Sequence, residues 1–167
     1  MGQSVDRINQ WLTLCANVGV LIGIGFLAYE IRQNTDATHA QTSEAVFAGK
    51  QVELQAVSDD PELIKSIIKQ DPLTVDEQIK PFTWLASALS AREFSWLQWK
   101  NDVIDETQWQ SELLILRGFL QAPRVRLWWE NVGYMTVSNE FRQYVEAEIE
   151  SLQPSNGIFE AQTRWAN

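Results

Sequence analysis

The sequence predicts an all-helical protein, in which one N-terminal transmembrane helix extends into a long rod and a compact bundle of about five helices follows. Three observations lead to this fold class. Residues 11–29 form an uncharged apolar run. Apolar side chains in the rest of the chain recur every three or four residues, as on one face of a helix. No stretch alternates between apolar and polar residues as a half-buried strand does.

The apolar run from 11 to 29 has the length and the flanks of a membrane span. At about 1.5 Å per residue a helix of this length covers about 28 Å, close to the thickness of the hydrocarbon core. Trp11 and Tyr29 stand at its ends, where aromatic rings favour the headgroup level. A buried core helix and a cleaved signal peptide are the alternatives. The run is apolar on every side and longer than the apolar region of a signal peptide, so an uncleaved single span is expected.

Small residues within the span predict helix packing in the membrane. Gly19 and Gly23 form a GxxxG pattern, and Cys15 lies one turn earlier. Such spacing lets two helix backbones approach closely in lipid. Asn17 is a polar side chain at membrane depth, where it needs a hydrogen-bond partner.

Residues 30–57 contain no proline and are expected to continue the span as a helical rod. Asn34, Thr38 and Gln41 belong to a stripe of uncharged side chains with a seven-residue repeat, typical of a coiled-coil-like seam. A solvated stalk, polar all round, is the alternative, and both interpretations stay open. The predicted helix-packing interface thus comprises Cys15, Asn17, Gly19, Gly23, Asn34, Thr38 and Gln41.

Helix-start signals divide the rest of the chain. Proline follows a Ser-Asp-Asp sequence at Pro61, Thr74 and Glu77 fit a capping box, and Pro123 and Ser138 are typical first-turn and cap residues. The expected helices cover 61–70, 74–101, 105–121, 123–132 and 138–152. Pro81 is expected to kink the second of these helices or to delay its regular start. The predicted domains are the span with its rod (1–57), a helical body (58–152) and a tail (153–167).

Several short motifs follow one another in a characteristic order. They are LAYEIRQNT at 27–35, Asp60–Leu63, Leu73–Glu77, Arg92–Phe94 with Trp96, Val103–Trp109, Pro123–Trp129 and Ser138–Val145. Over about residues 11–150 this order resembles a widespread family of uncharacterised bacterial membrane-anchored proteins. Pro81 departs from the family pattern. The resemblance implies a single-pass protein of the bacterial inner membrane and supplies no catalytic residue.

The charge balance and the scarcity of metal-binding side chains exclude several classes of function. The net charge of −9 argues against nucleic-acid binding, which needs a basic surface. One cysteine cannot form an internal disulfide, and one histidine with one cysteine leaves too few ligands for a zinc, haem or iron–sulfur site. No catalytic residue, metal or cofactor is therefore predicted. The basic residues flanking the span, Arg7 and Arg32, are nearly balanced, and the C-terminal body is placed in the cytoplasm.

One acidic residue lies on an apolar stripe. Glu93 falls between Leu89 and Trp96, and a buried carboxylate is costly unless it is paired. We therefore expect a buried ion pair of Glu93 with Arg124 or Arg126. A catalytic acid with a raised pKa is the alternative. The tryptophans at 84, 96, 99, 109, 128 and 129 are expected to fill the core.

Together these features predict a non-enzymatic, membrane-anchored interaction or assembly protein. It would act as a homo-oligomer or as an accessory subunit of a larger membrane complex. Its expected partners are membrane lipid and either copies of itself or other membrane-protein subunits. Two alternatives remain: an oligomeric pore lined by the rods, and a small-ligand binder or enzyme that uses Glu93 and the tryptophan cluster.

Overall fold

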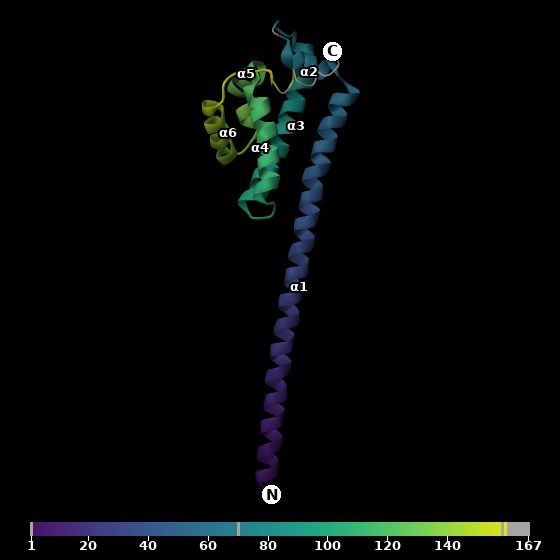
Figure 1. Ribbon diagram of the computed structural model, residues 1–167, viewed down its shortest axis with the longest axis vertical. Helices are drawn as coiled ribbons and strands as arrows, with labels where there is room; N and C mark the ends of the chain where they lie inside the picture. Colours follow the sequence, from purple (N-terminus) through teal and green to yellow (C-terminus); the bar gives the residue numbers. More distant parts are fainter. Residues whose placement is uncertain (1, 70, 158, 160–167) are drawn as a thin grey trace. The chain divides into compact units, whose positions relative to one another are not determined.

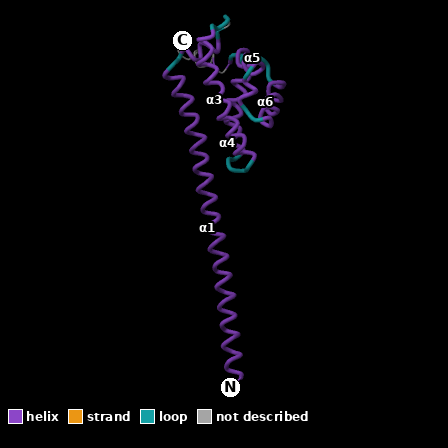
Figure 2. Tube along the Cα trace, turned by 180° about the vertical axis from the view of Figure 1, so that it is seen from behind, coloured by secondary structure: helices purple, strands orange, loops and turns teal. Residues whose placement is uncertain are grey.

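The computed structural model describes residues 2–69, 71–157 and 159, and these form helices joined by short loops. The all-helical class is confirmed, since no strand occurs in the described part of the chain (Figure 2). The elements are α1 (Gly2–Asp59), α2 (Glu62–Ile68), α3 (Val75–Lys100), α4 (Glu106–Gln121), α5 (Pro123–Asn131), the 3-10 helix η1 (Gly133–Thr136) and α6 (Asn139–Ser151).

The chain divides into two compact units, 1–41 and 42–167, and α1 contributes to both. The N-terminal half of α1 contains a stretch that is long and apolar enough to cross a membrane, and the described residues bury none of it. The last turns of α1 belong to the second unit, where Val46 is buried. The boundary expected from the sequence lies after residue 57, because residues 30–57 are predicted to form a rod outside the body. The observed boundary lies after residue 41.

The helix starts of the second unit are set by local capping. The Thr74 side chain accepts a hydrogen bond from the Glu77 N–H at 3.3 Å, while the Glu77 carboxylate accepts one from the Thr74 N–H at 2.8 Å. This reciprocal arrangement is the predicted capping box. Ser138 caps α6, and Pro123 occupies the first turn of α5. Pro81 is buried inside α3, and the helix is continuous from Val75 to Lys100.

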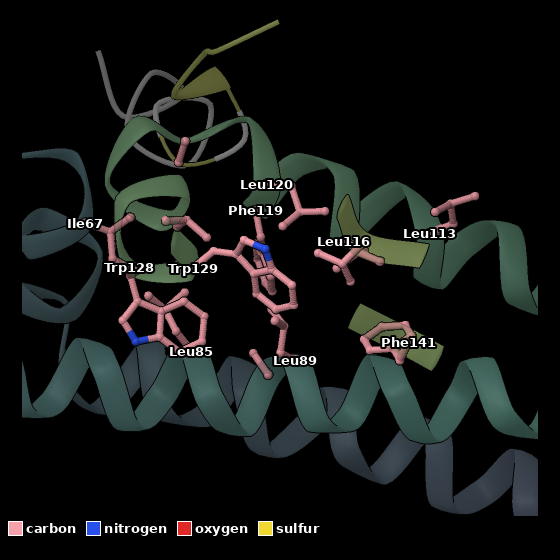
Figure 3. Packing of buried hydrophobic residues seen from close by; sticks show 14 of the residues in the cluster. Ile67, Leu85, Leu89, Leu113, Leu116, Phe119, Leu120, Trp128, Trp129 and Phe141 are labelled. Carbon is pink, nitrogen blue, oxygen red and sulfur yellow. The ribbon is translucent and has the colours of Figure 1, made fainter. Parts of the chain in front are cut away.

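The core of the second unit lies between α3 and α4, which pack side by side (Figure 1). Leu85 and Leu89 of α3 point toward Leu116 and its neighbours on α4, and two tryptophans of α5 fill the space between them (Figure 3). Trp96, Trp109, Trp128 and Trp129 are all buried, so these four tryptophans act as core residues as expected. Burial of such large rings is a main source of stability in a domain of this size.

The segment after α6 packs on this core. Phe159 is fully buried and stacks on Phe119 of α4, with ring centroids 5.6 Å apart and an interplanar angle of 11°. The Ser155 N–H also donates to the carbonyl of Gln121 at 2.7 Å. The part of the expected tail that the structure describes therefore belongs to the body. Residues 158 and 160–167 lie outside the described residues.

Candidate functional site

An ion pair lies at the centre of the second unit, between α3 and α4. Arg92 is 2% exposed and Glu112 is completely buried. The Arg92 Nη1 atom lies 3.1 Å from the Glu112 Oε2 atom. Each charge alone would be very costly at this depth, and the pairing offsets that cost only if both partners are present.

The end of α1 supplies the second half of the arrangement. Lys50 Nζ lies 2.6 Å from Glu112 Oε1, and Arg92 Nη2 donates to Glu53 Oε2 at 2.6 Å. Lys50, Glu53, Arg92 and Glu112 thus form a buried charge cluster with two cations and two anions from three helices. About two turns before Lys50, the Ser43 hydroxyl donates to the Gln108 side chain of α4 at 3.3 Å. The cluster and this bond attach the last turns of α1 to the body.

The surroundings of Glu53 alter its acidity. Burial raises the pKa of the Glu53 carboxyl above its ordinary value, and the neighbouring Glu112 acts in the same direction. Arg92 and Lys50 oppose this shift without cancelling it. The Glu53 carboxylate is therefore a stronger base than a glutamate at the protein surface.

A cavity of about 190 Å³ adjoins the charge cluster. Side chains of α1, α2 and α4 form its apolar walls, and Trp84 and Arg92 of α3 also line it. The apolar lining residues are Leu54, Val57, Ile64, Ile115 and Phe119. The described residues contain no group of three or more histidine, cysteine, aspartate or glutamate side chains that is able to hold a metal ion.

The expected ion pair of Glu93 with Arg124 or Arg126 does not form in the described structure. Glu93 is only half-buried, and its carboxylate accepts a hydrogen bond from the Ser138 N–H at 2.8 Å. Arg124 donates to the backbone carbonyls of Lys69 and Asp71. Arg126 likewise donates to backbone carbonyls, those of Leu120 and Leu152, both at 2.7 Å. All three side chains therefore form hydrogen bonds to backbone groups in place of the expected pair.

The α3 residue that forms the buried pair is Arg92, next to the expected Glu93, and its partner is Glu112 instead of Arg124 or Arg126. Arg92 follows Leu85 by seven residues and Leu89 by three, a spacing that places it on the buried face of α3. Glu112 lies three residues after Trp109 and four before Leu116, two core residues of α4. Two oppositely charged residues at core spacing on consecutive helices were the signal in the sequence.

The residues of the predicted helix-packing interface are all exposed on α1. Cys15 is a free, exposed thiol, and a Cβ atom added at Gly19 or Gly23 would meet no atom within 4 Å. Asn34, Thr38 and Gln41 are also exposed, and the Thr38 hydroxyl donates to the Asn34 carbonyl at 2.9 Å.

The residues of the predicted interface do not all lie on the same face of α1. At about 100° per residue, Asn17 points about 200° away from Gly19, so the two do not share one face. Gly23, Asn34 and Gln41 lie within about 20° of one another and do share a face.

Comparison of the chain with protein-family models, with curated proteins and with solved structures finds no match. The resemblance to the bacterial membrane-anchored family therefore stays a prediction from the sequence.

Proposed function

We propose that this protein is a single-pass, membrane-anchored interaction protein of the bacterial inner membrane, with α1 as anchor and the helical body on the cytoplasmic side. One observation carries the proposal: the apolar run of α1 from 11 to 29 has no cover among the described residues. Leu21 and Ile22 remain 68% and 67% exposed, whereas the body buries its own core completely. Exposed apolar surface of this extent costs about 25 cal/mol per Å² in water, and lipid removes that cost.

A second part of the proposal concerns what the anchor contacts within the membrane. The space around Gly19 and Gly23 is open, so a second helix is able to approach the backbone there. The same face continues to Asn34 and Gln41, whose uncharged polar side chains offer hydrogen bonds beyond the lipid. We take the partner to be a second copy of this chain, because a face of small residues complements itself. A different membrane subunit is the competing outcome.

Membrane insertion is tested by fractionation of the full-length protein. The wild-type chain should stay in the membrane pellet through an alkaline carbonate wash. Replacement of Leu21 and Ile22 by lysine should move most of it to the soluble fraction, because each charge at mid-membrane costs about 2.5–3.5 kcal/mol. Val52→Lys is the matched control, since Val52 is equally exposed on α1 but lies outside the span. Release of the wild-type chain by the wash would refute the anchor.

Association is tested through Cys15, the one cysteine of the chain. Oxidation of membranes that contain the protein should yield a disulfide-linked dimer. Gly19→Leu with Gly23→Leu should reduce the yield several-fold, because leucine keeps the backbones apart. Gly25→Leu is the control, since Gly25 points about 200° away from Gly23. A dimer yield that Gly25→Leu lowers equally would contradict the assigned face, and a cross-linked product of another size would identify a different subunit as the partner.

A further inference from the structure

Buried polar atoms without a hydrogen-bond partner gather at one place in the described structure. Of six such atoms, one belongs to Asn156 and the other five belong to Glu53, Trp84, Arg92 and Glu112. Both Glu112 oxygens lie within ion-pair distance of Lys50 or Arg92, so their charge is compensated. Glu53 Oε1, Trp84 Nε1 and Arg92 Nε remain. Each such group costs about 1–3 kcal/mol when it stays unpaired.

The three residues that carry these atoms line the same cavity. Its volume of about 190 Å³ exceeds the roughly 150 Å³ of an engineered apolar cavity that holds benzene. Val57, Ile64, Ile115 and Phe119 give most of its wall an apolar character. Leu54, another lining residue, is 63% exposed, so the cavity lies beside the protein surface. The cavity therefore has the size for a six-membered ring with one polar substituent, close to solvent.

We propose that this cavity binds a small uncharged molecule that carries an apolar ring and one hydroxyl group. A hydroxyl has one donor and two acceptor positions. The unpaired atoms are two N–H donors, on Trp84 and Arg92, and one carboxylate acceptor, on Glu53. The hydroxyl is thus the complement of this set, and the ring covers the apolar wall. A water molecule matches the polar atoms equally well, but it leaves the apolar wall uncovered.

The charges around the cavity select against ionised ligands. A carboxylate ligand would meet Glu53, while an ammonium ligand would meet Lys50 and Arg92. Because the four side chains of the charge cluster pair with one another, their net charge is zero when all are ionised. An uncharged ligand leaves this pairing intact. It also avoids the cost of burying a further cation or anion beside the two cations and two anions already present.

Occupancy of the cavity would link four helices of the second unit. Val57 belongs to α1, Ile64 to α2, Trp84 and Arg92 to α3, and Ile115 and Phe119 to α4. A ligand in contact with all four would stabilise the attachment of the last turns of α1. This inference is independent of the proposed membrane association, since every residue involved lies in the second unit.

The test uses the full chain, labelled with ¹⁵N and held in lipid nanodiscs, with phenol as the probe. Trp84→Phe identifies the indole N–H signal of Trp84, and the other seven tryptophans serve as internal references. Phenol should move the Trp84 signal with saturation and leave the other indole signals in place. Toluene, which lacks the hydroxyl, should bind at least about tenfold more weakly, because the three polar atoms then stay unpaired. Benzoate should produce no saturable shift.

Cavity-filling variants supply the control for site. Ile115→Phe and Val57→Phe should each abolish the saturable shift while the dispersion of the remaining indole signals shows an intact fold. Absence of a saturable phenol shift in the wild-type chain would mean that water alone occupies the cavity and would overturn the proposal. Equal affinities for phenol and toluene would overturn the role of the hydroxyl. A shift that persists in both filled variants would overturn the assignment of the site.

Discussion

Replacing Glu112 by glutamine removes the anion that touches both cations of the buried charge cluster, Arg92 at 3.1 Å and Lys50 at 2.6 Å. Arg92 is 2% exposed and cannot recover its hydration without opening the core. Loss of one partner of such a pair costs about 3–5 kcal/mol. For a body of this size, that loss lowers the melting temperature by roughly 10–20 °C.

Thermal unfolding of the full chain in detergent, followed by tryptophan fluorescence, measures this loss, because six of the eight tryptophans lie in the core of the body or pack against it. Glu140→Gln is the matched control. Glu140 lies 3.1 Å from Lys100, but its side chain is 71% exposed, so its removal should cost less than about 1 kcal/mol. The contrast between the two variants isolates the effect of burial.

A double-mutant cycle completes the experiment. Arg92→Met with Glu112→Leu removes both charges and should cost about 1–3 kcal/mol less than the sum of the two single changes. A Glu112→Gln cost no larger than that of Glu140→Gln would refute the described burial of the pair. A coupling energy of zero would refute the contact itself.

Three further predictions concern other parts of the body. Gly133→Ala should lower the free energy of unfolding, because a Cβ atom there would lie 2.6 Å from the Trp128 ring. Gly49→Ala should instead raise it by about 1 kcal/mol, since that helical site is open. Denaturant unfolding measures both changes. Because burial raises the pKa of Glu53, the folded state retains its proton at pH values where the unfolded chain has lost it. The free energy of unfolding of the wild type, relative to that of Glu53→Gln, should therefore fall as the pH rises from the ordinary pKa of a glutamate to the raised one. Thermal melts of both proteins at a series of pH values measure this difference, and a difference that grows with pH would contradict the prediction. Phe159→Ala should cost about 3–5 kcal/mol in thermal unfolding, and an unchanged melting temperature would show that the segment does not pack as described.

The helix starts of the body were predictable because their signals are local. The capping box of Thr74 and Glu77 needs only residues three apart in the chain, and the same holds for the Ser138 cap. The choice between Arg92 and Glu93 is different, since neighbouring residues on a helix differ by only about 100° in direction. Arg92 follows Leu89 by three residues and Glu93 follows it by four, so both fit the helical spacing of the apolar stripe.

The positions of distant residues decide that choice. Arg92 is buried because Glu112 and Glu53 lie where they pair with its charge. Glu93 instead meets the backbone N–H of Ser138, 45 residues later in the chain. The packing of Phe159 on Phe119 depends likewise on a contact between distant segments. Such contacts join residues far apart in the chain, and no pattern of neighbouring residues predicts them. The residues of the candidate site could therefore be assigned only from the folded structure.

The spacing of Lys50 and Glu53 also fixes how α1 is aligned along the body. Four residues before them on α1 stand Val46 and Gly49, and four residues after them stand Leu54 and Val57. None of these four carries a charge, so a slide of α1 by four residues in either direction would leave Arg92 and Glu112 to balance each other alone, without Lys50 and Glu53. Apolar contacts tolerate such a slide much better than charges do. The buried charges therefore select a single register of this helix on the body, a role distinct from any contribution to stability.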